Sequence, residues 1–239
     1  MSRARSAVAV VVPARNERDL ITACVRSIRR SLATAAVDGW IVVVADDCTD
    51  DTAARARLAI GAGGEVVERH LRSVGAARRL GCQRARRRFG TAPAEDLVLL
   101  STDADSVVAP NWVGAHLAAL DRGVAAIAGT VVVDSFGDRH PRLRRHFEHV
   151  YAPRRGGNHS HVHGANLSVR ADAYLAVGGF QPVATGEEHD LWARLRAAGY
   201  RVASTAAAPV RTSGRRVGRA PAGFADYLNT LESLVHEVA

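Results

Sequence analysis

Uninterrupted runs of branched apolar residues alternate with helical patterns through the first half of the sequence. Residues 7–12, 40–45 and 97–102 consist mostly of Val, Ile, Leu and Ala, and residues 20–32 carry apolar side chains at helical spacing. Strands that are apolar on both faces are typical of a parallel sheet with helices covering both sides. The sequence therefore predicts an α/β fold with a mostly parallel sheet, whose ligands bind beyond the carboxyl ends of the strands.

The same patterns predict further elements along the chain. We expect helices over residues 51–60, 74–88, 111–121, 171–177, 188–198 and 224–238, and strands over residues 65–68, 125–133 and 165–169. Residues 134–163 are polar and rich in Arg and His without a clear period. We expect a mobile loop near residues 154–161.

The length and composition fit one domain with an ample core. The chain has 239 residues, of which 47% are hydrophobic. Its three cysteines, Cys24, Cys48 and Cys82, have neither paired nor metal-type spacing, which favours a reducing compartment and a cytoplasmic location. The N-terminal apolar run stops at Pro13, well short of a membrane-spanning length, so we interpret it as a strand rather than a signal peptide.

The chain is strongly basic, with a formal net charge of +8 and an isoelectric point near 10.5. All 32 basic residues are Arg, which indicates biased codon usage as much as selection for charge. Only 5% of the residues are aromatic, and they do not interleave with basic residues as a base-stacking surface requires. We therefore expect no nucleic-acid partner, and assign the charge to a sugar-nucleotide diphosphate, a phosphorylated acceptor or a peripheral contact with an anionic membrane.

Two carboxylates stand directly after the strand predicted over residues 97–102. In an extended segment, positions i and i+2 project to the same side, so Asp103 and Asp105 can face one point. Two such charges about 5 Å apart repel by roughly 3 kcal/mol at an effective dielectric constant near 20, and a divalent cation relieves this repulsion. Oxygen ligands suit Mg²⁺, Mn²⁺ or Ca²⁺ rather than Zn²⁺. Alternatively, Asp105 or Ser106 only starts a turn or caps the next helix.

Polar residues also follow the first two predicted strands. Pro13 fixes the exit from the first strand, and Glu17 can accept hydrogen bonds from ribose hydroxyls, unless Asn16 and Glu17 only cap the next helix. The second strand ends in an acidic run, in which Asp46 can recognise a base N–H while Asp50 caps the following helix. Both segments are expected at the same edge of the sheet as the paired carboxylates.

Basic residues gather before and within the helix predicted over residues 74–88. Guanidinium groups and the amide dipoles of a helix start can neutralise a diphosphate, and Arg78 and Arg79 are the candidates for this contact. The arginines within residues 84–88 more simply form a solvated face.

Three acids fall within four residues at the start of the helix predicted over residues 188–198. The helix dipole favours acids in a first turn, yet capping alone does not require three. If an acceptor hydroxyl loses a proton as it attacks, Glu188 or Asp190 is its base. We expect His161 and His163, just before a Gly turn, to line the same cleft.

Five segments, in this order and at these spacings, resemble family 2 glycosyltransferases with the GT-A fold: VVVPARNE, VVVADDCTDDT, LLSTDADS, HGANLSVRADAYLAVGGF and GEEHDLWARLRAAGY. The resemblance covers roughly residues 7–205. It implies a nucleoside-diphosphate sugar donor, and a Mn²⁺ or Mg²⁺ ion that bridges the donor diphosphate to Asp103 and Asp105. The donor contacts expected from the residues and the resemblance together are Pro13, Ala14, Arg15, Glu17, Asp46, Arg78, Arg79, Asp103, Ala104 and Arg211.

The resemblance also implies roles for residues in the second half. The family's catalytic base lies in a Glu-Asp motif at a helix start, which matches Glu188 here, with Asp190 as its rival. Many relatives place a metal-binding His after the final core strand, where this chain has Arg211; an Arg cannot ligate a metal, but it can grip a diphosphate. The expected acceptor side comprises His161, His163, Gly164, Asn166 and Glu187.

We therefore expect a single GT-A domain with a nucleotide-binding half (residues 1–110), an acceptor-binding half (111–217) and a C-terminal amphipathic helix (218–239). The resemblance implies in-line displacement at the anomeric carbon, toward a small-molecule, lipid-linked or glycan acceptor. Inversion is the family's usual outcome, but retaining relatives share the same fold, so the sequence leaves the stereochemistry open. The alternatives are a nucleotidyltransferase, whose usual Gly-rich first loop is absent from VVPARNE, and a noncatalytic domain that binds nucleotide sugars or nucleic acid. The sequence leaves the oligomeric state open.

Overall fold

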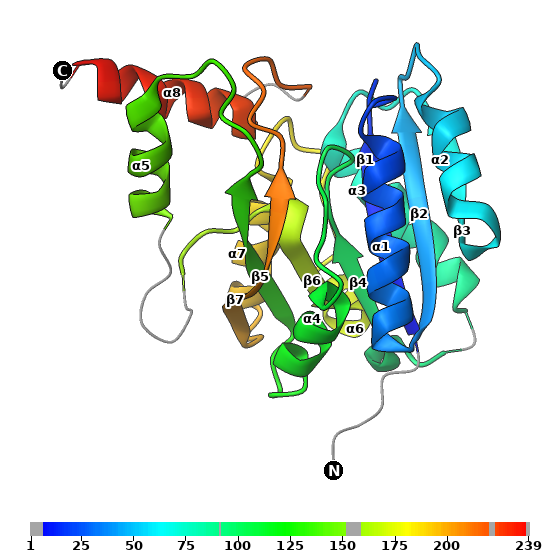
Figure 1. Ribbon diagram of the computed structural model, residues 1–239. Helices are drawn as coiled ribbons and strands as arrows, with labels where there is room; N and C mark the ends of the chain where they lie inside the picture. Colours follow the sequence, from blue (N-terminus) through cyan, green and yellow to red (C-terminus); the bar gives the residue numbers. More distant parts are fainter. Residues whose placement is uncertain (1–6, 91, 152–158, 220–222, 238–239) are drawn as a thin grey trace.

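The structure, a computed structural model, describes residues 7–90, 92–151, 159–219 and 223–237. These residues form a seven-stranded sheet with helices on both faces (Figure 1). The strands are β1 Ala7–Ala14, β2 Asp38–Asp46, β3 Gly64–Arg69, β4 Leu97–Ser101, β5 Ala126–Val133, β6 Leu167–Arg170 and β7 Val202–Thr212. The helices are α1 Ile21–Ala35, α2 Thr52–Ile60, α3 Val74–Arg88, α4 Trp112–Leu120, α5 Pro141–Val150, α6 Ala171–Ala176, α7 Glu187–Ala197 and α8 Phe224–Glu237.

The strands lie in the order β3-β2-β1-β4-β6-β5-β7. Their pairings are parallel except those of β6, which runs antiparallel to both β4 and β5. The expected α/β class and mostly parallel sheet are therefore confirmed. In the observed register, Val10 of β1 lies beside Ile41 of β2 and Leu100 of β4, so these three strands end at the same edge of the sheet.

The central strand β1 is buried along its whole length because helices cover both sides of the sheet. Val8, Val10 and Val12 belong to one core cluster with side chains of α1, α2 and α4. The alternate residues Ala9 and Val11 belong to a second cluster, with side chains of α3, α6 and α7. Because successive side chains of a strand point to opposite faces, only a continuous apolar run satisfies both clusters.

Helices α5 and α8 pack against each other beside the β5 and β7 end of the sheet (Figure 1). The sequence did not predict α5, because only Leu143 and Phe147 of this helix are buried and the apolar stripe is too short to give a clear period. Its start is defined locally, since Pro141 occupies the first turn and His140 accepts a hydrogen bond from the Arg142 N–H at 3.2 Å. Most of the loop expected near residues 154–161 lies outside the described residues.

The sequence pattern did not predict strand β7 either, because Ala, Ser and Thr dominate its residues and Pro209 interrupts them. A proline is tolerated there, since β7 is the edge strand and its pairing with β5 shifts register in this region. Among the described residues, no helix has the length and apolar character needed to cross a membrane.

Candidate active site

A cavity of about 550 Å³ opens at the edge of the sheet where β1, β2 and β4 end. Its walls also include the first turns of α3 and α7 and the segments after α5 and β7. This volume is ordinary for a ligand pocket. The cavity brings together most of the expected site residues, namely Pro13, Ala14, Arg15, Glu17, Asp46, Arg78, Asp103, Ala104, Asp105, His161, His163, Gly164, Glu187 and Glu188.

At one end of the cavity, the carboxylate of Asp46 orders the turn that leads into α3. It accepts hydrogen bonds from the backbone N–H groups of Leu71 at 2.5 Å, Arg72 at 3.0 Å and Ser73 at 3.1 Å. These bonds occupy most of the lone pairs of a carboxylate. Asp46 therefore holds the wall of the cavity, and Ser73, which caps α3 by accepting from the Ala76 N–H at 3.2 Å, presents the helix start to it.

The rim at this end is a cluster of charges around Asp47. Its carboxylate pairs with Arg15 and Arg72, each at 2.9 Å, and with His70 at 3.1 Å. The hydrogen bond from His70 and the neighbouring guanidinium groups hold the pKa of Asp47 below its usual range. Asp47 and Arg72 both have positive φ angles, 56° and 52°, a conformation that costs energy in residues other than glycine and is common at binding sites.

Beneath the cavity, Arg78 joins α3, β4 and α7. Its Nε donates to Ser101 Oγ at 2.9 Å, its Nη2 lies 2.5 Å from Asp103 Oδ1, and its Nη1 pairs with Glu187. Gly164 lies so close to this guanidinium that a Cβ at that position would be 2.3 Å from Nη2. Arg78 therefore positions the surrounding residues rather than presenting a free guanidinium to a ligand.

The carboxylates of Asp103, Asp105 and Glu188 lie close enough to influence one another. Burial raises the pKa of Asp103 to about 6 against the lowering effect of Arg78, and the charges of Asp105 and Glu188 add to the rise. All three side chains line the cavity. The cavity therefore favours a cationic or proton-bearing group between them.

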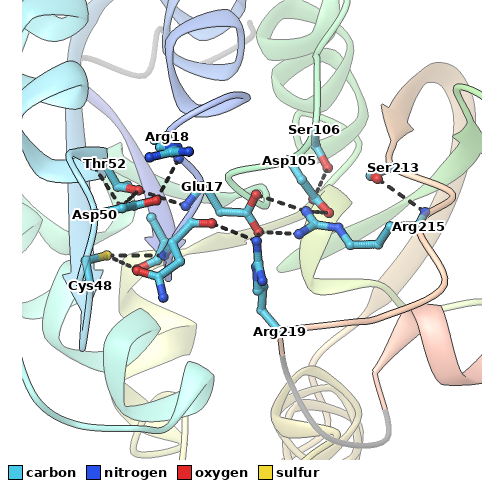
Figure 2. A network of polar contacts seen from close by, with 12 residues as sticks. Glu17, Arg18, Cys48, Asp50, Thr52, Asp105, Ser106, Ser213, Arg215 and Arg219 are labelled. Atoms are coloured by element: carbon cyan, nitrogen blue, oxygen red, sulfur yellow. Dashed lines mark hydrogen bonds and ion pairs between the residues drawn. The ribbon is translucent and has the colours of Figure 1, made fainter.

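The guanidinium of Arg215 bridges two acids that come from different strand ends (Figure 2). Its Nη1 lies 2.8 Å from Glu17 Oε1, and its Nη2 lies 3.0 Å from Glu17 Oε2 and 2.5 Å from Asp105 Oδ2. Arg219 adds a contact of 3.7 Å to Glu17 and donates to the Asn16 carbonyl at 3.0 Å. Even so, burial raises the pKa of Glu17 above its usual value.

The donor set does not fit a resident Mn²⁺ or Mg²⁺ ion as it is arranged. Asp103 and Asp105 supply suitable oxygens, but each is already paired with a guanidinium. Within the described ranges, no group of three or more His, Cys, Asp or Glu residues is placed to hold a metal. Arg211, where the resemblance implies a metal-binding His, pairs with Asp134 at 3.6 Å and lines a smaller cavity that shares Asp105 and Arg215 with the main one.

The first turn of α7 separates the candidates for the catalytic base. Glu187 is almost fully buried and pairs with Arg78. Asp190 is held by Arg194 on the same helix, with its Oδ2 at 2.6 Å from Nη2 and 3.0 Å from Nε, and it does not line the cavity. Glu188 does line it, so the geometry favours Glu188 over Asp190.

Aromatic and histidine rings line another wall. The rings of Tyr151 and His161 stack with centroids 4.1 Å apart, and His163 lies 5.5 Å from Tyr151. Burial lowers the pKa of His163 to about 3, so this ring is neutral at ordinary pH. Phe224 and Tyr227 of α8 also line the cavity. The sequence predicted the two histidines of this wall but not its aromatic residues, because these are scattered along the chain and those of α8 fit an apolar helix face.

Besides Asp190, three expected site residues do not line the cavity. Asn166 is fully buried in the core, where its amide donates to the carbonyls of Thr130 and Ala208 and its oxygen accepts from Trp112. Arg79 donates to the Phe180 carbonyl at 3.2 Å outside the cavity. Arg211 belongs to the smaller cavity, and the arginine that reaches the carboxylates is Arg215.

Comparison with known proteins supports the resemblance. The model of the family described as glycosyl transferase family 2 matches residues 9–177. A comparison with curated proteins finds no match to this sequence.

Solved structures share the fold at low sequence identity. Staphylococcus aureus TarS 1–349 in complex with UDP-GlcNAc has a TM-score of 0.64 and 13% identity, over 95% of this chain and 65% of that one. The mannosyltransferase PcManGT from Pyrobaculum calidifontis, in complex with GDP-Man and Mn²⁺, has a TM-score of 0.63 and 19% identity, over 96% and 69%. Mycobacterium tuberculosis glucosyl-3-phosphoglycerate synthase with Mg²⁺ and UDP has a TM-score of 0.53 and 17% identity, over 97% and 77%. The chain spans less than two thirds of the TarS chains that it matches.

Proposed function

Since the chain belongs to glycosyl transferase family 2 and has the GT-A fold, we propose that it transfers a sugar from a nucleoside-diphosphate sugar to a hydroxyl group of an acceptor. The observation that carries this proposal is that Glu188 lines the same cavity as the carboxylate of Asp105 and the guanidinium of Arg215 that is paired with it. A base and a cationic site in one cavity are what the attack of a hydroxyl group and the departure of a diphosphate require.

The donor would lie along the edge of the sheet. Its base and ribose would occupy the end formed by Pro13, Arg15 and the turn held by Asp46, and its diphosphate would reach the start of α3 and the guanidinium of Arg215. Backbone N–H groups at a helix start and guanidinium groups are both favourable partners of phosphate oxygens. UDP-GlcNAc and GDP-Man, named for two of the similar structures, belong to this class of donor.

The transfer itself would be a single in-line displacement with inversion. A hydroxyl oxygen of the acceptor bonds to the anomeric carbon while the bond from that carbon to the diphosphate oxygen breaks. The hydroxyl proton passes to Glu188, and the electron pair leaves with the nucleoside diphosphate. The ion pair between Glu187 and Arg78 would hold Glu188 in position, since Glu187 is the preceding residue and is almost fully buried.

The acceptor would enter beside the wall of Tyr151, His161 and His163. Flat, neutral rings pack well against the apolar face of a sugar ring or a similar small group. This wall suits a small-molecule or glycan acceptor, or the head of a lipid-linked one. Because all three cysteines are free thiols, we assign the reaction to the reducing cytoplasm.

The second question to be tested is whether donor binding and transfer depend on a divalent metal ion. The Mn²⁺ and Mg²⁺ ions named above belong to the similar structures. In this chain, an ion on Asp103 and Asp105 would require the ion pairs with Arg78 and Arg215 to open.

A screen of sugar nucleotides tests the proposal. The purified protein is incubated with UDP-, GDP- and TDP-sugars, and release of the nucleoside diphosphate by slow hydrolysis is measured with EDTA and with MnCl₂. We expect one donor to be hydrolysed, and Glu188→Gln to reduce transfer once an acceptor is found. Release of pyrophosphate from nucleoside triphosphates and sugar phosphates would instead indicate a nucleotidyltransferase. Binding of a sugar nucleotide without turnover of any kind would indicate a noncatalytic binding domain.

A further inference from the structure

The guanidinium of Arg215 occupies the position between carboxylates where a cation is needed. Glu17 comes from the loop after β1, Asp105 from the segment after β4, and Arg215 from the segment after β7. Figure 2 shows both carboxylates directed at this one guanidinium. Three strand ends are therefore joined by a cation that the chain itself supplies.

A divalent ion bound to the Asp105 carboxylate would lie beside this guanidinium. The Nη2 atom of Arg215 is 2.5 Å from Asp105 Oδ2, and metal–oxygen bonds to Mg²⁺ or Ca²⁺ span about 2.0–2.6 Å. An ion on the other lone pair of that oxygen would bring two positive charges within a few Å of each other, which is unfavourable. The position between the two carboxylates is already occupied by the positive charge of Arg215. Glu17 holds this guanidinium in place, because its carboxylate contacts both terminal nitrogen atoms.

The rest of the site supplies few further metal ligands. The Asp103 carboxylate is paired with the buried Arg78, and the hydroxyl group of Thr212 lies 3.4 Å from Asp105 Oδ1. The arginine at the position of the family's His, Arg211, faces the smaller cavity.

The guanidinium of Arg215 still has a donor to offer a ligand. Its two Nη2–H groups donate to Glu17 and Asp105, and Nη1 lies 2.8 Å from Glu17 Oε1. Among the described residues, no hydrogen bond engages its Nε–H, so this donor remains for a ligand. Arg215 lines the main cavity together with Arg219. A diphosphate placed against them would meet charge-assisted hydrogen bonds without displacing either carboxylate.

We propose that Arg215 is the resident cation of the donor site. It holds the Glu17 and Asp105 carboxylates together and binds the donor diphosphate directly, so that donor binding needs no divalent metal. This inference rests on the proposed function, because it concerns the diphosphate of the same donor.

Calorimetric titration tests the inference. UDP, GDP, uridine and guanosine are titrated into the wild-type protein and into Arg215→Ala, Arg215→Lys and Arg211→Ala, with EDTA and then with excess MnCl₂. We expect a nucleoside diphosphate to bind the wild type with about the same affinity in both conditions. Arg215→Ala should weaken its binding at least about tenfold, with Arg215→Lys in between, because a charge-assisted hydrogen bond is lost.

Two controls separate the outcomes. Nucleoside binding should be equal in wild type and Arg215→Ala if only the diphosphate contact is lost. Arg211→Ala, which removes an arginine from the same strand end but outside the cavity, should bind like the wild type. A tenfold gain in wild-type affinity with MnCl₂, or unchanged diphosphate binding by Arg215→Ala, overturns the inference while leaving the proposed function standing. Failure of every nucleoside diphosphate to bind overturns both.

Discussion

The carboxylate of Glu187 and the guanidinium of Arg78 form an ion pair in which both side chains are almost completely buried, with 2% and 4% of their surfaces exposed. The pair links the first turn of α7 to α3, and the same guanidinium of Arg78 also forms an ion pair with Asp103. The residue after Glu187 is Glu188, the candidate base. The floor of the cavity and the position of the base therefore depend on one buried contact.

Replacing Glu187 with Gln should destabilise the protein. It leaves the buried charge of Arg78 with fewer compensating partners, and breaking a buried pair in this way costs about 3–5 kcal/mol. Urea unfolding checks this value, with Asp51→Asn as the control. Asp51 forms an exposed pair with Arg55 at 2.8 Å, and losing such a pair costs at most about 1 kcal/mol. Equal effects of the two substitutions would contradict the structural role given to Glu187.

Replacing Glu188 with Gln should abolish most transfer without affecting donor binding. A general base contributes about 10²- to 10⁴-fold to the rate, and the amide cannot take the proton. The measurement is kcat with the donor and acceptor found by screening, beside nucleoside diphosphate affinity. Asp190→Asn is the matched control, because Asp190 is held by Arg194 and should keep kcat within a few-fold. The assignment is wrong if Asp190→Asn loses activity and Glu188→Gln does not.

Replacing Asn166 with Ala should act on stability rather than on the acceptor. The substitution removes the partner of the buried Trp112 Nε1 and of the Thr130 carbonyl, and each unsatisfied buried group costs about 1–3 kcal/mol. Thermal unfolding measures the loss, while the KM for the acceptor should stay unchanged in the folded protein. A raised KM for the acceptor with unchanged stability would show that Asn166 acts in the acceptor site, and would contradict its structural role.

The stability of the protein should fall in mild acid because of His116. Its Nε2 lies 2.8 Å from Asn166 Oδ1 and its Nδ1 lies 2.7 Å from Ser168 Oγ, an arrangement that suits the neutral ring donating to Asn166. Burial lowers its pKa from 6.5 to about 4. Between these values the unfolded chain binds a proton that the folded chain does not, so stability is full above pH 6.5 and decreases as the pH falls toward 4.

This contribution amounts to at most about 3 kcal/mol, since each pKa unit corresponds to 1.36 kcal/mol. Denaturant unfolding at several pH values measures it, with His116→Gln as the comparison. The Gln variant should be less stable near neutral pH, and its stability should depend less on pH across the same window. An identical pH dependence in both proteins would show that His116 is not the group responsible.

The sequence predicted those parts of the fold that have local signals. The apolar runs of β1, β2 and β4 and the period of α1 lie within single segments, and the bounds of α3 agree with the expected residues 74–88. Because parallel strands end at a common edge, the sequence also placed Pro13, Asp46 and Asp103 at one site.

The remaining parts depend on contacts that no local pattern carries. Arg215 and Glu17 are 198 residues apart, and nothing in the run after β7 shows which of its arginines turns back to the first loop. Asn166 follows a Gly turn that lies close in sequence to two cavity histidines. Its side chain nevertheless lies in the core, where it forms hydrogen bonds with Trp112, His116 and Thr130. Burial of a polar residue is decided by such partners, which only the fold brings together.

The most direct test of the account is the position of a nucleoside diphosphate in crystals of the protein. We expect the base beside the turn held by Asp46 and the diphosphate between Arg215 and the start of α3, with Glu188 facing the free side of the terminal phosphate. A nucleotide bound elsewhere on the molecule, with this cavity closed to it, would contradict the account.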